Sequence, residues 1–139
     1  MSNALVPELA VANCQVSLAF YCGVLGFTLR YARPEEGFAY LNLGQAELMI
    51  DQIDQGRTFD ADHQPPRPPY GWGVNLQIRV PDVAVLVSAL YAVAVPLVLP
   101  VEDRWYRRDL TEVCNRQFIV ADPDGYLLRF YQDLGTRDI

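Results

Sequence analysis

Histidine and cysteine are scarce in this chain of 139 residues, which contains one histidine and three cysteines. The histidine, His63, lies in a proline-rich segment, and we interpret it as a solvated loop residue. A metal site of two histidines and one carboxylate cannot be built from one such chain. The cysteines, Cys14, Cys22 and Cys114, are odd in number and show no Cys-x-x-Cys spacing, so we expect reduced, mostly buried thiols.

Long apolar runs and an excess of positive charge are also missing. No segment approaches the roughly 20 apolar residues that a membrane-spanning helix needs. Residues 1–4 lack the basic stretch of a secretory signal, so we expect a cytoplasmic protein that has no membrane partner. The net charge of −6 repels nucleic-acid phosphates, which excludes nucleic acid as a partner and favours a cation among charged ligands.

The predicted elements repeat once along the chain. Each half opens with a short apolar strand and a helix N-cap, which is Asn13 in the first half and Asp82 in the second. Apolar residues at helical spacing follow each cap, and each half then returns to strands. The predicted strands are 5–11, 38–43 and 46–51, then 74–80, 117–120 and 126–130. The order β-α-β-β-β, found twice, predicts an α+β fold.

Turn signals separate these elements. Gly26 is a candidate left-handed helix stop, Gly44 and Gln45 fit a tight turn, and DPDG at 122–125 fits a type I turn. Residues 54–72 are rich in proline, which favours a surface linker or a lid across a pocket mouth. We therefore predict one domain, 1–139. Its parts are module one at about 4–54, a linker at 55–72 and module two at about 73–135.

The doubled module resembles the vicinal oxygen chelate superfamily, which includes glyoxalases, extradiol dioxygenases, and fosfomycin- and bleomycin-resistance proteins. Residues 17–27 look like the first helix of that family and its exit, and DPDGY at 122–126 looks like its last hairpin. EEGFAYL at 35–41 and LLRF at 127–130 are most similar to the bleomycin-resistance branch. The resemblance implies two half-barrel modules that form one curved mixed sheet with a cleft, in a dimer that shares modules between chains.

The resemblance also says where catalytic members hold a divalent metal. The first ligand stands five residues before the valine that precedes the helix, which gives Val6 and Asn75 here. The last stands four residues after the turn glycine, which gives Arg129, with a counterpart at about Ile50. An arginine is a permanent cation and carries only donors, so it repels a metal. We therefore predict no metal, no cofactor and no catalytic residue.

Three functions remain open. The first is that of a bleomycin-resistance protein, which in the resembled branch binds a cationic, aromatic glycopeptide antibiotic without altering it and so gives antibiotic resistance. The second is a metal-dependent glyoxalase- or dioxygenase-like enzyme acting on a small oxygen-rich substrate. The third is a structural or regulatory module without a small ligand. We favour the first, metal-free antibiotic binding by a cytoplasmic homodimer, because the metal positions lack metal-binding side chains.

An antibiotic of this type needs flat apolar walls for stacking and negative charge for its cationic tail. Phe38 opens a strand, Trp72 begins the second module, and Trp105 and Tyr106 lie in a predicted long loop, 99–113. Glu102 and Asp103, in the same predicted loop, we interpret as solvated charges. Two further expectations concern charge. Arg129 is expected to pair with a carboxylate on the cleft floor, and acidic residues near the mouth are expected to supply negative charge: Asp51, Asp54, Asp60 and Asp62. The predicted ligand-binding residues are Phe38, Trp72, Asn75, Trp105, Tyr106 and Arg129.

Overall fold

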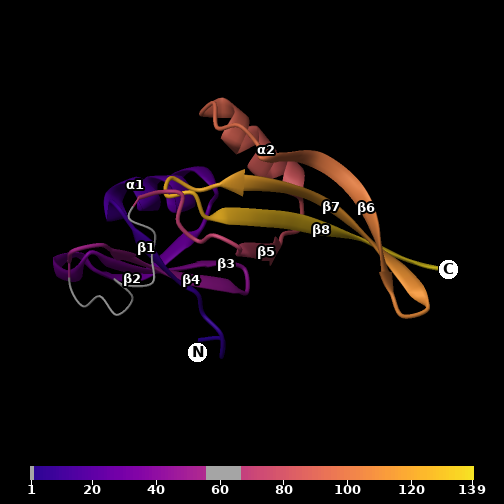
Figure 1. Cartoon of the computed structure of the whole chain (residues 1–139), viewed down its shortest axis with the longest axis horizontal. Coiled ribbons are helices and arrows are strands. Elements are labelled where there is room, and N and C mark those ends of the chain that lie inside the picture. Colours follow the sequence, from indigo (N-terminus) through magenta and orange to yellow (C-terminus); the bar gives the residue numbers. More distant parts are fainter. Residues whose placement is uncertain (1, 56–66) are drawn as a thin grey trace. The chain divides into compact units, whose positions relative to one another are not determined.

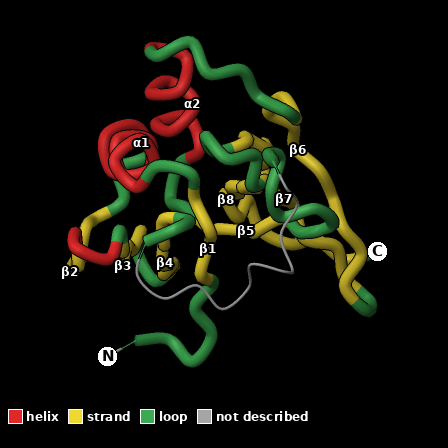
Figure 2. Tube along the Cα trace, turned by 60° about the vertical axis from the view of Figure 1, so that its left-hand side comes forward, coloured by secondary structure: helices red, strands yellow, loops and turns green. Residues whose placement is uncertain are grey.

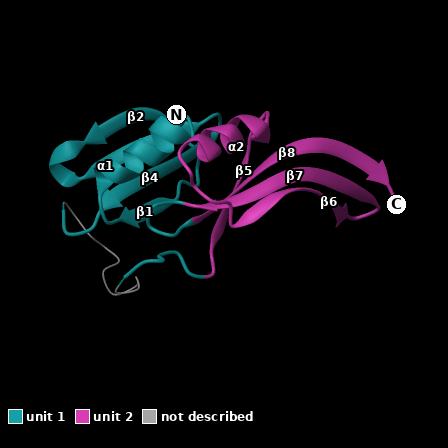
Figure 3. Ribbon diagram, turned by 90° about the horizontal axis from the view of Figure 1, so that it is seen from above, with its two compact units in different colours: residues 1–72, 122–126 teal, residues 73–121, 127–139 magenta. Residues whose placement is uncertain are grey.

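The computed structural model describes residues 2–55 and 67–139. The elements follow the predicted order, with β-α-β-β-β in each half. Two compact units result: unit 1 contains residues 1–72 and 122–126, and unit 2 contains residues 73–121 and 127–139 (Figure 3). His63, Asp60 and Asp62 lie outside the described residues. Among the described residues, no helix has both the length and the apolar character needed to span a bilayer.

Unit 1 contains one four-stranded sheet with the strand order β1-β4-β3-β2. Strand β1 runs parallel to β4, and the other two pairs are antiparallel. The strands are β1 (Glu8–Val11), β2 (Thr28–Arg33), β3 (Phe38–Leu43) and β4 (Ala46–Gln52). The helical segments are α1 (Cys14–Leu18), the π-helix η1 (Ala19–Val24) and the 3-10 turn η2 (Pro34–Glu36).

The predicted first helix is confirmed, with one difference in its second half. The Asn13 side chain accepts hydrogen bonds from the amides of Gln15 and Val16, as an N-cap does. The helix then widens into η1, in which Leu25 N donates to Phe20 O. Gly26 follows with φ +82°, so the predicted left-handed stop is confirmed.

The two faces of the unit 1 sheet differ in what covers them. One face lies under α1, which contacts β4 and whose Cys14 N donates to Gln52 Oε1 at 2.9 Å. Side chains of this face are fully buried, among them Ile50 and Leu41. Because side chains alternate along a strand, Met49 and Asp51 point to the opposite face. We call that opposite face the open face of unit 1.

The DPDG turn belongs to unit 1, and its carboxylates are buried. Gly125 N donates to Asp122 O, so the predicted turn is confirmed. One carboxylate oxygen of Asp122 accepts from Tyr21 Oη at 2.6 Å, and the other accepts from the amides of Asp124 and Tyr126. Burial raises the pKa of Asp122 to about 6, although these hydrogen bonds oppose the shift. Burial and the neighbouring carboxylate also raise the pKa of Tyr21.

Unit 2 repeats the plan with the strand order β5-β8-β7-β6. Its elements are β5 (Asn75–Arg79), α2 (Val83–Ala92), β6 (Leu99–Arg108), β7 (Thr111–Ala121) and β8 (Leu127–Asp138). Strand β5 runs parallel to β8, while β6–β7 and β7–β8 are antiparallel. Figure 2 shows α2 as one of the helices of the chain. It begins at the predicted cap, where the Asp82 side chain accepts from Ala84 N at 2.9 Å.

Strands β6 to β8 are much longer than the sequence patterns predict (Figure 1). The predicted loop at 99–113 is wrong, because β6 covers most of it and includes Trp105 and Tyr106. Charged residues stand on both faces of this strand, from Glu102 to Arg108, and they hide its period-2 alternation. We call the paired strands β6, β7 and β8 the long ribbon. At its end, near residues 107–112, the ribbon is held by hydrogen bonds between the strands, and most side chains there are exposed.

Candidate ligand-binding site

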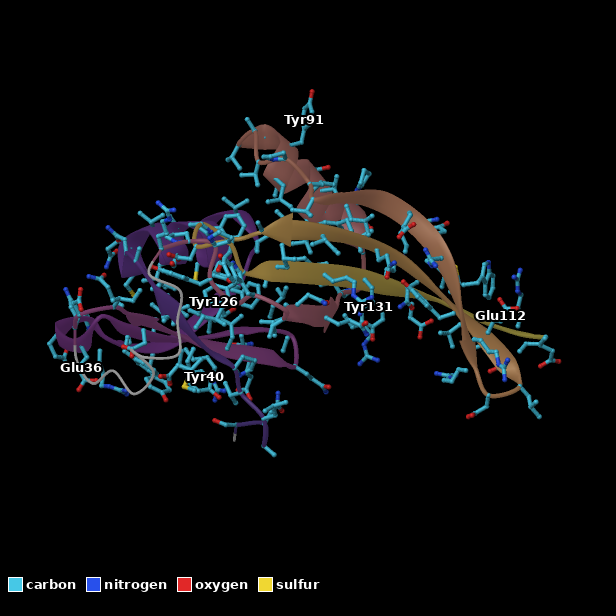
Figure 4. The ribbon with its side chains drawn as sticks, in the orientation of Figure 1. Glu36, Tyr40, Tyr91, Glu112, Tyr126 and Tyr131 are labelled. Carbon is cyan, nitrogen blue, oxygen red and sulfur yellow. The ribbon has the colours of Figure 1, made fainter. Side chains whose placement is uncertain are left out.

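The unit 2 sheet buries one face and leaves the other without a helix. Helix α2 contacts β7 and β8, and Val83 N donates to the Gln132 side chain at 3.2 Å. Fully buried aromatic residues, Phe118 and Phe130, stack on this side with ring centroids 5.5 Å apart. The alternate side chains form what we call the open face of unit 2, which includes these polar and charged residues: Asn75, Gln77, Arg79, Glu102, Arg104, Tyr106, Gln117, Arg129 and Tyr131. Figure 4 shows Tyr131 on the side of β8 away from α2.

Arg129 stands near the middle of this face. It is paired with Gln77 across the parallel strands β5 and β8, and its Nη2 donates to Gln77 Oε1 at 2.6 Å. Within residues 2–55 and 67–139 its side-chain partner is this neutral amide, and no carboxylate forms an ion pair with it. A half-buried guanidinium therefore faces the open side of the sheet without a counter-charge in the described chain.

Gln117 joins two neighbouring side chains on the same face. Its Nε2 donates to Tyr106 Oη at 2.7 Å and to Glu102 Oε1 at 3.1 Å. Gln117 is 2% exposed, so this amide is buried although the face has no helix over it. Sequence reasoning missed Gln77 and Gln117. No local signal in the sequence distinguishes either glutamine from other polar residues in the strands.

Trp105 and Tyr106 are neighbours in β6 and therefore point to opposite faces of the sheet. Tyr106 lies on the open face through its bond to Gln117. Trp105 is opposite the buried Cys114, and the guanidinium of Arg137 lies 3.8 Å from its ring centroid. Arg137 also pairs with Glu112, labelled near the end of the long ribbon in Figure 4. The two rings are thus not one wall, whereas Asn75, Tyr106 and Arg129 do share one face.

The open face of unit 1 carries a stack of aromatic rings. Tyr31 lies 5.2 Å from Tyr40, nearly parallel to it, and 6.1 Å from Phe38. Tyr40 is labelled in Figure 4. Phe38 itself is buried, with the guanidinium of Arg33 3.9 Å from its ring centroid. Tyr31, which sequence reasoning missed, is the half-exposed ring of this stack, at 49%.

Acidic and aromatic residues meet on this unit 1 face. Phe38 is directly opposite Asp51 in the β3–β4 register, so both side chains leave the sheet on one side. Asp54 follows β4 and is exposed. Trp72, the other predicted residue of unit 1, lies in the loop before β5 and is 73% exposed. The half-exposed ring of Tyr31 lies on the same face as the Asp51 carboxylate, and this combination suits a ligand that is both aromatic and cationic.

The parallel strand pairs allow the two units to be compared position by position. Gln77 is opposite Arg129 in unit 2, and Glu8 is opposite Met49 in unit 1. Gln77 and Glu8 each stand three residues before the valine that precedes the helix cap, so Met49 is the counterpart of Arg129. The sequence placed this counterpart at about Ile50, one residue further along the chain. The side chain of Ile50 points to the other face of the sheet, into the layer under α1.

The four positions that the resemblance assigns to a metal therefore hold Val6, Met49, Asn75 and Arg129. A thioether and an amide are weak ligands for hard or borderline divalent ions, and a guanidinium repels them. Within the described part of the chain, no three His, Cys, Asp or Glu side chains come together as a metal-binding group. The side chains at these positions do not fit a divalent metal, so we derive no chemistry through one.

Comparisons with known proteins agree with this architecture. Residues 4–130 match the sequence model of the Glyoxalase/Bleomycin resistance protein/Dioxygenase superfamily. A bleomycin resistance protein of Geobacillus stearothermophilus is 27% identical, over 93% of this chain and 96% of that protein. TioX from Micromonospora sp. ML1 has a TM-score of 0.67 at 23% identity, covering 96% of this chain and all (100%) of TioX. A virulence protein from Salmonella typhimurium gives 0.65 at 20% identity, covering 95% and 98%. These likenesses confirm the predicted two-module α+β fold.

Proposed function

The chain belongs to the glyoxalase/bleomycin resistance protein/dioxygenase superfamily, and from that premise we propose that it binds and sequesters a cationic, aromatic glycopeptide antibiotic of the bleomycin type. Binding needs no metal and leaves the antibiotic unaltered, so the protein confers resistance by sequestration and is not an enzyme. The observation that carries the proposal is Arg129, a guanidinium without an ion pair among the described residues, at a position where catalytic members of the resembled superfamily hold a metal ligand.

Each open face, taken by itself, offers groups that suit such a ligand. In unit 1, Phe38 and Asp51 are direct neighbours and Tyr31 is half exposed, which suits stacking against a flat cationic group. In unit 2, Asn75, Tyr106 and Arg129 suit polar groups that fix the orientation of the ligand. The net charge of −6 attracts a cation over a longer range.

Trp72 and Trp105 belong to the same proposal. Trp72 is exposed in its loop, and we propose it as a further wall for the aromatic part of the ligand. Trp105 is 38% exposed on the face opposite to Tyr106, and we propose it for contact with the ligand or with a second copy of the chain. A homodimer that shares modules is part of this proposal, as is a cytoplasmic location. Three free cysteines support a reducing compartment.

A fluorescence titration tests the proposal. The chain has two tryptophans, so bleomycin is added to the wild type and to the variants Trp72→Phe and Trp105→Phe, each with and without EDTA. We expect a dissociation constant below about 1 μM, equivalent to about −8 kcal/mol, that EDTA does not change. The single-tryptophan variants report which ring the ligand approaches.

Two results would contradict this function. Spermidine, which is cationic but has no aromatic group, is the matched control, and binding as tight as that of bleomycin would mean that charge alone is recognised. Binding that EDTA abolishes and added Zn²⁺ or Mn²⁺ restores would favour the metal-dependent enzyme instead. An oligomeric state measured by sedimentation at the same concentrations tests the homodimer separately.

A further inference from the structure

Two polar atoms on the open face of unit 2 are buried without a hydrogen-bond partner: Gln117 Oε1 and Arg129 Nε. Gln117 is 2% exposed, and its amide oxygen has no hydrogen-bond partner among the described residues. Buried polar groups in folded proteins are nearly always paired, because an unpaired one loses its bonds to water and gains nothing in return. Two such atoms on one face of one sheet indicate a place where a ligand completes the bonding.

The two side chains are close neighbours in the sheet. Arg129 in β8 is directly opposite Ile119 in β7, and Gln117 stands two residues from Ile119 on the same face. The pairing is regular here, because the only irregularity between these strands lies at Cys114 and Asn115. Diagonal neighbours of this kind are separated by roughly 7–8 Å at Cα, which long side chains span readily.

The orientation of the Gln117 amide is fixed by its other partners. Its nitrogen donates to Glu102 Oε1 and to Tyr106 Oη. An ionised carboxylate only accepts hydrogen bonds, so the amide group that faces Glu102 must be the nitrogen. The amide oxygen is therefore the unpaired atom, and it is an acceptor that requires a donor.

Arg129 carries an unpaired donor, whereas Gln117 carries an unpaired acceptor. One terminal nitrogen is held by Gln77 at 2.6 Å, which fixes the plane of the guanidinium. The unpaired Nε–H is a donor that requires an acceptor. The two side chains thus carry one unpaired acceptor and one unpaired donor on the same face of neighbouring strands.

We infer that Gln117 and Arg129 form a subsite for a planar ligand group in which a carbonyl stands beside an N–H, as in a carboxamide, a urea or a carbamate. The carbonyl oxygen accepts from Arg129 Nε, and the adjacent N–H donates to Gln117 Oε1. A carboxylate accepts a hydrogen bond from Arg129 Nε, but its second oxygen then faces Gln117 Oε1, which is also an acceptor. An ammonium group satisfies Gln117 but meets the charge of Arg129. This inference rests on the proposed function and deepens it by naming the part of the ligand that unit 2 takes.

Three probes that share one ring separate these chemistries: benzamide, benzoate and benzylamine. Each is titrated into the ¹⁵N-labelled wild type while the Arg129 Nε–H and the Gln117 side-chain amide signals are followed by NMR. The signals are assigned by their loss in Arg129→Lys and Gln117→Met. We expect benzamide to shift both signals saturably, and the other two probes to bind at least tenfold more weakly. Benzoate binding as tightly as benzamide, or no shift with benzamide, overturns the inference.

A matched pair of variants extends the test to the larger ligand. Gln117→Met keeps the size of the side chain and removes the acceptor, and Gln15→Met makes the same change at an exposed position in α1 of unit 1. We expect the dissociation constant for bleomycin to rise at least tenfold in Gln117→Met and to stay unchanged in Gln15→Met. The benzamide titration uses the wild type, so it decides the matter even if Gln117→Met folds poorly.

The outcomes separate the two proposals. If benzamide shifts both signals and bleomycin does not bind, the subsite stands and the antibiotic assignment fails. If bleomycin binds tightly, Gln117→Met does not weaken it, and benzamide causes no shift, the subsite fails and the antibiotic assignment stands.

Discussion

The parallel strand pair β1–β4 of unit 1 has the same arrangement as β5–β8 of unit 2, with the first strand leading into a helix in each case. The open faces nevertheless differ in chemistry. In unit 1, Tyr31, Phe38 and Tyr40 stack on one another. In unit 2, the corresponding face carries amides, phenols, a carboxylate and guanidinium groups.

This difference shows how one supersecondary plan supplies two kinds of surface. The face under the helix must be apolar in both units, because it forms the core, and Ile50 and Phe130 are fully buried there. The open face has no such constraint, so its residues are free to differ between the units. The comparison predicts that substitutions on the core faces change stability and that substitutions on the open faces change binding.

The largest expected effect tests the strand register of unit 1. Ile50→Gln places an amide in the fully buried layer under α1, and we expect it to lower the free energy of unfolding by about 4 kcal/mol. Met49→Gln, one residue earlier, points to the open face and is expected to cost less than about 1 kcal/mol. Urea denaturation measures both. Equal losses for the two variants would show that the register is wrong.

Sequence patterns predicted most of the fold but not this register. The doubled order of elements, both helix caps and the DPDG turn followed from local signals at Asn13, Asp82 and residues 122–125. Met49 and Ile50 are both apolar, so their alternation did not show which one faces the core. Only the pairing of Met49 with Glu8 across β1 and β4 decides it.

The second prediction concerns the buried carboxylate of Asp122 in the DPDG turn of unit 1. The pKa of Asp122 is about 6 in the folded chain, against an ordinary value of 3.8. The folded state therefore holds the proton more tightly, and stability falls as pH rises from about 4 to about 6. The full difference corresponds to about 3 kcal/mol. Chemical denaturation at several pH values measures this loss.

The variant Asp122→Asn isolates that titration. Its amide oxygen still accepts from the turn amides, but it has no proton to lose. We expect the stability of the wild type relative to this variant to fall by about 2 kcal/mol between pH 4 and pH 7. Asp138→Asn, at an exposed position in β8, is the matched control and should show no such trend. A flat difference for Asp122→Asn would contradict the raised pKa.

The third prediction tests the aromatic stack of unit 1. Tyr31→Ala removes the half-exposed ring, and we expect bleomycin to bind about tenfold more weakly, equivalent to about 1.4 kcal/mol. The same variant should lower stability by about 1 kcal/mol, because the ring stacks on Tyr40. Tyr91→Ala, on the exposed surface of α2 in Figure 4, is the control. An equal loss of affinity in both variants would remove the stack from the binding site.

The candidate site was less predictable than the fold, for a physical reason. Asn75, Tyr106 and Arg129 were found from the sequence, and the structure places them on one face of the unit 2 sheet. Gln117 and Gln77 were missed, because an isolated glutamine in a strand has no distinctive spacing. Their importance comes from hydrogen bonds between neighbouring strands, β6 with β7 and β5 with β8, which no local pattern encodes.

The smallest expected effect is a gain in stability, whereas the earlier variants lose stability. It separates binding from stability because the two are expected to change in opposite directions. Arg129 is a half-buried cation whose only described partner is the neutral amide of Gln77, so its burial is poorly compensated. Arg129→Met keeps the length of the side chain, and we expect it to raise the free energy of unfolding by up to about 1 kcal/mol while weakening the binding of bleomycin. Arg116→Met, which removes a two-bond pair with Asp103, is the control and should not stabilise the chain. A clear loss of stability in Arg129→Met would mean that the guanidinium holds the fold together, and its assignment to ligand recognition would then lose its physical basis.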